Sequence, residues 1–287
     1  MPALIDIRRR IRSVKNTQQI TKALKMVSAA KLRRAQESMF AARPYARTMA
    51  QVLKDVASRA EGEENHPLFR ATSGTGKVLF IVVTADKGLC GAFNSSLLRV
   101  AQKFLVENTA REVVVDAVGR KGRDFLRRRT KVRKEYIGVF QSLAYAKAQA
   151  IAQSAMQAFL DREVDEVVLL YNEFKSVIQQ RIVTQRLLPL DVVDAAVEEE
   201  AKGAQNYVYE PDPRTIFDKL LPKVVEISVW QALLESNAAE HGARMAAMDS
   251  ATRNASQTID SLTLYMNKVR QAAITKEIIE VVSGSAA

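Results

Sequence analysis

The residues best suited to chemistry in this chain are few and far apart. Two histidines, His66 and His241, and one cysteine, Cys90, are all that 287 residues provide. A structural zinc site needs about four nitrogen or sulfur ligands at short spacings, and no residue near Cys90 suggests a catalytic dyad. A single cysteine also excludes an internal disulfide framework and fits a reducing compartment. We predict no metal, no cofactor and no catalytic centre.

Two glycine-bearing segments could in principle hold a phosphate. Residues 74–77 (GTGK) precede an apolar run instead of following it, and Val78 stands where a phosphate loop requires a hydroxyl residue. Residues 86–91 (DKGLCG) follow a strand and open a helix, as nucleotide sites do, but lack the full glycine spacing. We interpret them as a tight strand-to-helix turn. A nucleotide-dependent enzyme with a helical dimerisation arm remains an alternative, which nucleotide-dependent protection of residues 86–91 from hydrogen exchange would favour. The arginines at 127–129 are interpreted as a solvated helix end.

The middle of the chain alternates between two periodicities. Short runs rich in β-branched residues predict strands at 78–83, 113–118, 132–137, 166–171 and 178–188. Helical patterns lie between them: one ends near Glu107, a short basic one follows Gly119, and one spans 143–161. Such alternation predicts a small, doubly wound α/β domain with a mostly parallel sheet, whose last strand pairs antiparallel.

The C-terminal quarter reads as one very long helix. Asp212 can cap its first turn and Pro213 suits the first helical position. From Phe217 to Ala273, steps of three and four residues meet apolar side chains at all but three positions. One seam of this length predicts a coiled coil, about 110 Å long for about 75 residues. Pro222 is expected to kink the helix or to mark its true start.

The N-terminal segment, from Leu4 to Ala60, is also predicted to be helical. Its apolar seam is interpreted as three stretches, with a slip near Thr17 that makes Ile20, Leu24 and Val27 the second stretch, and with a kink at Pro44. Residues 1–60 hold 14 basic and 3 acidic residues, whereas the rest of the chain holds 29 of each, so the whole net charge of +11 lies on this segment. An acidic partner is expected, and nucleic acid, anionic lipid and an acidic protein surface all qualify.

Chain order constrains the two long helices further. One enters the central domain and the other leaves it, so they can lie side by side only antiparallel. The second is longer by about 18 residues, which predicts an overhang of roughly 27 Å. This overhang is apolar on several sides, so we expect another protein to enclose it. No run approaches eighteen uncharged apolar residues, so no membrane span is expected.

Three segments carry a resemblance to a known family. Residues 11–31 (IRSVKNTQQITKALKMVSAAK), 84–94 (TADKGLCGAFN) and 265–278 (YMNKVRQAAITKEI), the last followed by 280–284, resemble the gamma subunit of bacterial F-type ATP synthases. The resemblance implies a central rotor shaft that transmits torque between the c ring and the catalytic alpha/beta hexamer. It also implies that the epsilon subunit is a partner, that the membrane is reached only through the c ring, and that the chain lies at the cytoplasmic face of the bacterial cell membrane. The chain would then be a non-catalytic subunit.

The same resemblance assigns contact residues. The residues implied to contact beta-subunit loops are Arg270, Gln271 and Thr275 near the tip, and Lys22, Lys25, Met26 and Arg244 lower down. The residues implied to contact the epsilon subunit or the c ring are Tyr207 and Glu210.

The expected fold class is therefore α/β, a long antiparallel coiled coil with a Rossmann-like domain between its helices. The expected boundaries are an N-terminal helix at 1–60, a linker at 61–76, the α/β domain at 77–193, a linker at 194–211 and the C-terminal helix at 212–287. A basic coiled-coil protein that binds nucleic acid remains the alternative function. The basic segment offers only Phe40 and Tyr45 for stacking on bases, which is poor for that purpose.

Overall fold

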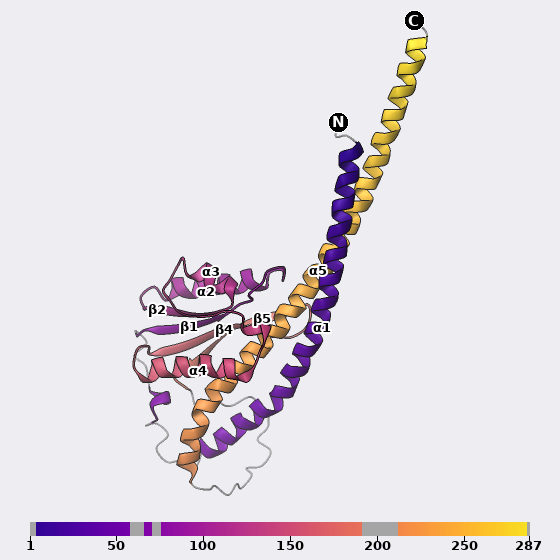
Figure 1. Cartoon of the computed structure of the whole chain (residues 1–287). Coiled ribbons are helices and arrows are strands. Elements are labelled where there is room, and N and C mark those ends of the chain that lie inside the picture. The colour runs from indigo at the N-terminus through magenta and orange to yellow at the C-terminus, as the bar shows by residue number, and fades with distance from the viewer. Residues whose placement is uncertain (1–3, 58–65, 71–75, 191–211, 286–287) are drawn as a thin grey trace.

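The computed structural model describes residues 4–57, 66–70, 76–190 and 212–285. Two long helices, α1 (Leu4–Ala57) and α5 (Pro213–Ser285), run antiparallel, and a compact α/β domain sits beside one end of the pair (Figure 1). The predicted fold class is confirmed. No described helix is both long enough and apolar enough to cross a bilayer.

The domain is built on a five-stranded sheet in the order β3-β2-β1-β4-β5. Its strands are β1 (Val78–Val83), β2 (Val113–Val118), β3 (Val132–Tyr136), β4 (Glu166–Phe174) and β5 (Gln180–Leu188). The first four are parallel and β5 is antiparallel to β4, as predicted. The last strand starts two residues later than expected because Ser176 N–H donates to the Gln179 carbonyl, closing a hairpin turn that leaves Ile178 90% exposed.

Helices cover both faces of the sheet. On one face α2 (Phe93–Glu107) and α3 (Arg120–Leu126) bury Phe80 and its even-numbered neighbours in β1. On the other face α4 (Tyr145–Leu160) and part of α5 bury Leu79, Ile81 and Val83. Every β1 side chain is buried, because a central parallel strand has helices on both sides. Short 3-10 turns occur at Pro67–Phe69 and Val139–Gln141.

Helix α5 has a second buried face, which the sequence analysis missed. The predicted seam packs with α1 at Leu234 and Ala238. Its first residue, Phe217, and a neighbouring apolar stripe pack instead against the α/β domain, with α4 and the sheet as their neighbours. That stripe consists of Leu221, Val225, Val229, Ala232 and Leu233. In its first half α5 is therefore a core helix of the domain as well as one of the two helices of the coiled coil. A search for apolar residues at an average spacing of 3.5 can detect only one of these two faces.

The start of α5 is as predicted. Asp212 Oδ1 accepts a hydrogen bond from the backbone N–H of Thr215 at 2.9 Å, and its other oxygen accepts from the Thr215 hydroxyl. These hydrogen bonds lower the pKa of Asp212. The helix continues through Pro222, so the idea that this proline marks the true start was wrong. Helix α1 likewise continues through Pro44.

The seam of α1 has no slip near Thr17, and that prediction was wrong. Steps of four and three residues run without interruption from Ile7 through Thr21 and Ser28 to Leu32 and Met39, all of them buried. The apolar residues Ile20 and Val27, which were predicted to lie in the seam, are 60% and 52% exposed. The middle of the seam is polar, so apolar periodicity predicts the neighbouring stripe that contains Ile20 and Val27.

Cross-helix contacts set the register of the pair. Gln18 contacts Ser256, Lys25 contacts Asp249, and Arg43 contacts Glu235. Extending this register places Leu4 opposite residue 270 or so, which leaves about 15 residues of α5 unpaired, or roughly 22 Å. This overhang is slightly shorter than the roughly 27 Å predicted. Figure 1 shows α5 extending beyond the N-terminal end of α1.

Candidate subunit interface

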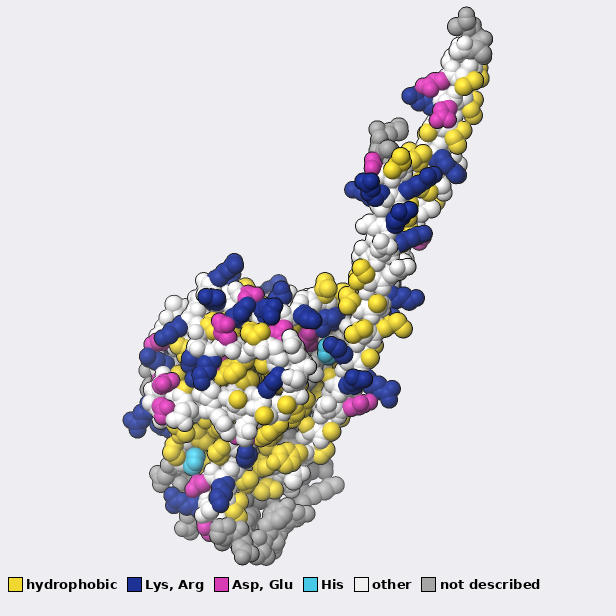
Figure 2. Space-filling model, viewed as in Figure 1, with side chains coloured by type: hydrophobic (Ala, Val, Ile, Leu, Met, Phe, Trp, Pro, Cys, Tyr) yellow, Lys and Arg dark blue, Asp and Glu magenta, His cyan; other side chains and the backbone are white. Residues whose placement is uncertain are grey.

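The overhanging tip of α5 is open on all sides. Arg270, Gln271 and Thr275 are exposed there, and the Thr275 hydroxyl donates to the Gln271 carbonyl of its own helix at 3.0 Å. Apolar side chains on several sides of this tip are 48–72% exposed. They are Ile274, Ile278, Ile279, Val281 and Val282. Figure 2 shows apolar side chains following the upper end of the coil among basic ones. An apolar surface of this kind is suited to burial in a surrounding protein collar.

Halfway down α1, two of the three predicted contact residues face solvent. Lys22 and Met26 lie one helical turn apart, and Met26 is 68% exposed. Lys25 instead has a partner within the chain, because its Nζ lies 2.5 Å from Asp249 Oδ1 on α5. This hydrogen bond lowers the pKa of Asp249. Lys25 therefore ties the two helices together, while Lys22 and Met26 are free to meet a partner.

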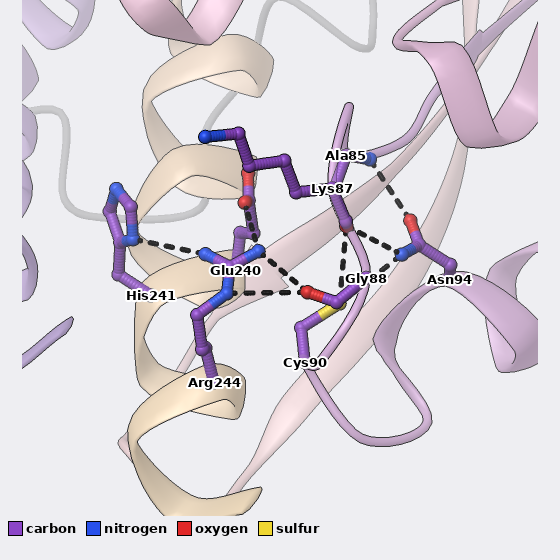
Figure 3. Close-up of polar contacts among 8 residues, drawn as sticks. All are labelled: Ala85, Lys87, Gly88, Cys90, Asn94, Glu240, His241 and Arg244. Carbon is purple, nitrogen blue, oxygen red and sulfur yellow. Dashed lines mark hydrogen bonds and ion pairs between the residues drawn. The ribbon is translucent and has the colours of Figure 1, made fainter. Parts of the chain in front are cut away.

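Arg244 on α5 is also engaged within the chain (Figure 3). Its side chain is only 12% exposed, and Nη2 lies 2.7 Å from Glu240 Oε1 one turn earlier. Nη2 and Nε also donate to the Gly88 carbonyl, at 3.2 and 3.4 Å. The guanidinium thus joins α5 to the turn between β1 and α2. One planar fork reaching both an acid and a carbonyl is a contact that lysine could not reproduce.

Burial sets the electrostatics of this junction. It raises the pKa of Glu240, an effect that the charge of Arg244 opposes. It also lowers the pKa of His241 to about 4, with Arg244 and Lys31 acting in the same direction. His241 is therefore neutral at physiological pH. Its Nδ1 atom lies 3.5 Å from Nη1 of Arg244.

The turn at residues 86–91 connects β1 to α2, as predicted. The Asp86 carboxylate accepts from the backbone N–H groups of Arg120 and Gly138 at 3.0 and 3.1 Å. The Asp86 carboxylate is therefore engaged by backbone groups of its own domain. Leu89 has a positive φ of 62° and is 66% exposed.

The remaining predicted residues have simpler outcomes. Tyr207 and Glu210 lie outside the described residues. The helix end at 127–129 is exposed, and Arg129 lies over the Phe125 ring at 3.7 Å, in agreement with a solvated helix end. Among the residues that the structure describes, no group of acids, histidines and cysteine could hold a metal ion.

Buried carboxylates on α5 were missed entirely. Glu226 is 2% exposed and accepts from Tyr145, Lys223 and two glutamines of α4. Glu235 is likewise 2% exposed. The sequence did contain a signal for these two residues. Both glutamates lie in helical segments that are apolar on every side, so they must be buried, and a buried glutamate is almost always paired.

Comparison with known proteins places the chain in a family. Residues 3–287 match the family model described as ATP synthase. The chain is 52% identical over its full length to the ATP synthase gamma chain of Solibacter usitatus, covering 99% of that protein. It is 48% identical over 99% of its length to the gamma chain of Geotalea daltonii, covering 98% of that protein.

Solved structures of ATP synthases contain chains that are similar to this one. A chain of the Tetrahymena thermophila mitochondrial ATP synthase central stalk and c ring is 28% identical, with a TM-score of 0.60, over 81% of this chain and 99% of that one. A chain of the Euglena gracilis mitochondrial enzyme shares the fold at 17% identity, with a TM-score of 0.69, over 99% of this chain and 94% of that one. These relatives lend no support to the nucleic-acid alternative. With its sequence matched from end to end and its two long helices and sheet domain arranged as in a central stalk, the chain belongs to the gamma-subunit family of F-type ATP synthases.

Proposed function

We propose that this chain is the central rotor shaft of an F-type ATP synthase, carrying torque between the c ring and the catalytic alpha/beta hexamer. The observation that carries the proposal is the unequal antiparallel pair, α1 and α5, with an exposed apolar overhang at its free end. A stiff helix pair anchored in a folded domain can transmit a twist. Its apolar tip needs an enclosing partner, which the hexamer supplies.

The shaft's asymmetry gives it a role in catalysis without an active site of its own. The side of the pair that bears α1 differs from the side that bears α5, so three equivalent catalytic sites around it meet different surfaces. A ligand or partner shifts an equilibrium only by its differential interaction with the states involved. Rotation exchanges those differential contacts among the three sites, and ATP release and ion movement are linked through them.

Contacts with the hexamer are assigned to two regions of the helix pair, the tip and a lower region. Arg270, Gln271 and Thr275 meet beta-subunit loops near the tip, where all three are exposed. Lys22 and Met26 meet the moving part of the beta subunits lower down. Beta-subunit contact at this lower level also includes Lys25 and Arg244, and their intrachain partners, Asp249 and the Gly88 carbonyl, hold both side chains in place.

The opposite end of the molecule completes the rotor. We assign Tyr207 and Glu210 to contacts with the epsilon subunit or the c ring. Through that ring the chain is attached to the membrane indirectly, at the cytoplasmic face of the bacterial cell. The support for a bacterial setting is the roughly half identity to bacterial gamma chains.

Removing the overhang tests the proposal. The complete ATP synthase is assembled with a chain truncated before Ala273, and with a control truncated before Ser283. We expect the first variant to assemble but to lose ATP-driven proton pumping to a greater extent than it loses assembled complex. The control should pump like the wild type. Recovery of the full-length chain free of alpha and beta subunits would contradict the proposal.

A further inference from the structure

Strand β4 extends beyond its neighbour in the sheet. The last pair between β1 and β4 joins Val82 to Leu170, yet β4 continues to Phe174. On the β1 side, the backbone N–H groups of the extension have no strand to bond to. Buried N–H groups need an acceptor, because leaving one unpaired is costly.

Helix α5 supplies those acceptors. The N–H of Asn172 donates to Ser236 Oγ at 3.4 Å, and the N–H of Phe174 donates to Glu235 Oε2 at 3.0 Å. Ser236 and Glu235 are both buried. Two side chains of α5 thus continue the hydrogen bonding of the sheet where β1 ends.

The second oxygen of Glu235 binds the other long helix. Arg43 Nη2 on α1 lies 3.1 Å from Glu235 Oε1, with the glutamate side chain 3% exposed and the arginine 34% exposed. The Arg43 guanidinium also lies over the Phe40 ring at 5.0 Å. One buried carboxylate therefore connects α1, α5 and β4.

This connection lies where α5 leaves the domain. Seven residues further along α5, Gly242 approaches Phe174 so closely that an added methyl group would come within 3.3 Å of the ring. From Asp249 onward, α5 makes polar contacts with α1 through Asp249, Thr252 and Ser256. A twist applied to the domain acts on the helix pair at this exit.

We propose that Glu235 and Arg43 form the joint that fixes the rotational register of the helix pair against the α/β domain. The inference rests on the proposed function as a shaft. Apolar packing is non-directional and permits small slips between helix and domain. A buried ion pair that also receives a backbone N–H has one satisfactory geometry, and fixing register is the best-attested use of buried polar groups. Both are positioning residues and touch no substrate.

The test uses the complete ATP synthase in inverted membrane vesicles, with ATP hydrolysis and ATP-driven proton pumping measured together. Glu235→Gln removes the charge but retains an acceptor for the Phe174 N–H, and Arg43→Gln leaves the glutamate buried without its partner. The matched control is Glu37→Gln, which breaks an exposed pair with Arg33 on α1, where the side chains are 62% and 83% exposed.

For Glu235→Gln and Arg43→Gln we expect hydrolysis to persist while protons pumped per ATP fall by about half or more, because a loosened joint lets α1 and the part of α5 beyond Glu235 twist against the domain, in whose core the first half of α5 stays packed. Glu37→Gln should match the wild type. The double variant Glu235→Gln/Arg43→Gln should pump better than Arg43→Gln alone, because no unpaired buried charge remains. That partial rescue is not expected of two independent losses of stability.

Three results would overturn the proposal that Glu235 and Arg43 form this joint. One is pumping per ATP equal to that of Glu37→Gln in both single variants. Another is a loss of pumping, hydrolysis and assembled complex in equal proportion, which is a folding defect. Should neither single variant assemble, the double variant Glu235→Gln/Arg43→Gln, which leaves no unpaired buried charge, is measured instead, and pumping per ATP equal to that of Glu37→Gln also refutes the proposal. Pumping by vesicles that lack the chain altogether would refute the shaft function itself, which separates the two failures.

Discussion

The hydroxyls of Thr21 and Thr252 lie 2.8 Å apart across the interface between α1 and α5. Thr21 is 8% exposed, so this contact sits inside the seam of the coiled coil. Each hydroxyl also lies within hydrogen-bonding distance of a carbonyl in its own helix, that of Gln18 at 3.0 Å and that of Met248 at 2.7 Å. The seam of this coil is thus polar at its middle, with apolar layers on either side.

Replacing both threonines by valine should show that the pair is coupled. Thr252→Val alone leaves the Thr21 hydroxyl without its partner across the seam and should cost about 1 kcal/mol of unfolding free energy. The double Thr21→Val/Thr252→Val variant should return to within about 0.5 kcal/mol of the wild type, because both polar groups are gone. Urea unfolding of the full-length chain, followed by circular dichroism, measures both. A double variant whose loss equals the sum of the two single losses would show that the hydroxyls act independently.

Gly119, at the end of β2, should not tolerate a side chain. Its φ is +91°, and an added Cβ would lie 2.1 Å from the Thr84 carbonyl oxygen. Gly119→Ala should therefore cost about 3 kcal/mol or more, from backbone strain and overlap together. Gly88→Ala is the control, since its Cβ would meet only Lys121 Cε at 3.9 Å. Thermal unfolding midpoints compare the two variants, and equal midpoints would contradict the account of this turn.

Asp116 is fully buried in β2 and depends on Arg133 of β3. Arg133 binds both carboxylate oxygens, through Nη2 at 2.5 Å and Nε at 2.9 Å. Arg133→Met should cost about 3–5 kcal/mol because it leaves a buried charge unpaired. Asp116→Leu/Arg133→Met should recover most of that loss, since an apolar pair of similar volume needs no partner. Denaturant midpoints test this, and a double variant no more stable than Arg133→Met would contradict it.

His241 should make stability depend on pH in the acidic range. Burial, with help from Arg244 and Lys31, lowers its pKa from 6.5 to about 4. Between these values the unfolded chain takes up a proton that the folded chain does not, so stability falls as the pH falls from about 6.5 to 4. His241→Gln should remove about 1–2 kcal/mol of this fall, a figure reduced for partial exposure.

The raised pKa of Glu240 acts in the opposite sense, because a folded state that binds a proton more tightly gains stability as the pH falls. The informative quantity is therefore the difference in melting temperature between wild type and His241→Gln across this range. A difference that does not change with pH would contradict the assignment.

The apolar pattern of the sequence was sufficient for the broad architecture. The continuous apolar run at Val78–Val83, rich in β-branched residues, predicted a central strand, and the capped start at Asp212 predicted the origin of a long helix. Both are present. Chain order alone then required the antiparallel pairing. These features depend on local propensity and burial, which a single sequence records well.

The features that define the contacts were harder to predict, because they depend on pairs distant in sequence. The polar seam at Thr21 and Ser28 carries no apolar signal, so apolar periodicity instead predicts the exposed Ile20 and Val27 as seam positions. Resemblance assigned Arg244 to an intersubunit contact, but it could not show that the Gly88 carbonyl, 156 positions away, also binds its guanidinium. The roles of such residues are set by tertiary partners.

The most direct test of the central claim is to watch the chain turn. The alpha/beta hexamer is fixed to a surface, and a bead is attached to a cysteine introduced at Arg128, an exposed position on the α/β domain. The native Cys90 is buried and will not compete for the label. If the helix pair is the shaft, adding ATP produces sustained rotation of the bead in one direction, which stops when ATP is exhausted. A bead that stays fixed, or that wanders equally in both directions while ATP is hydrolysed, would contradict the account.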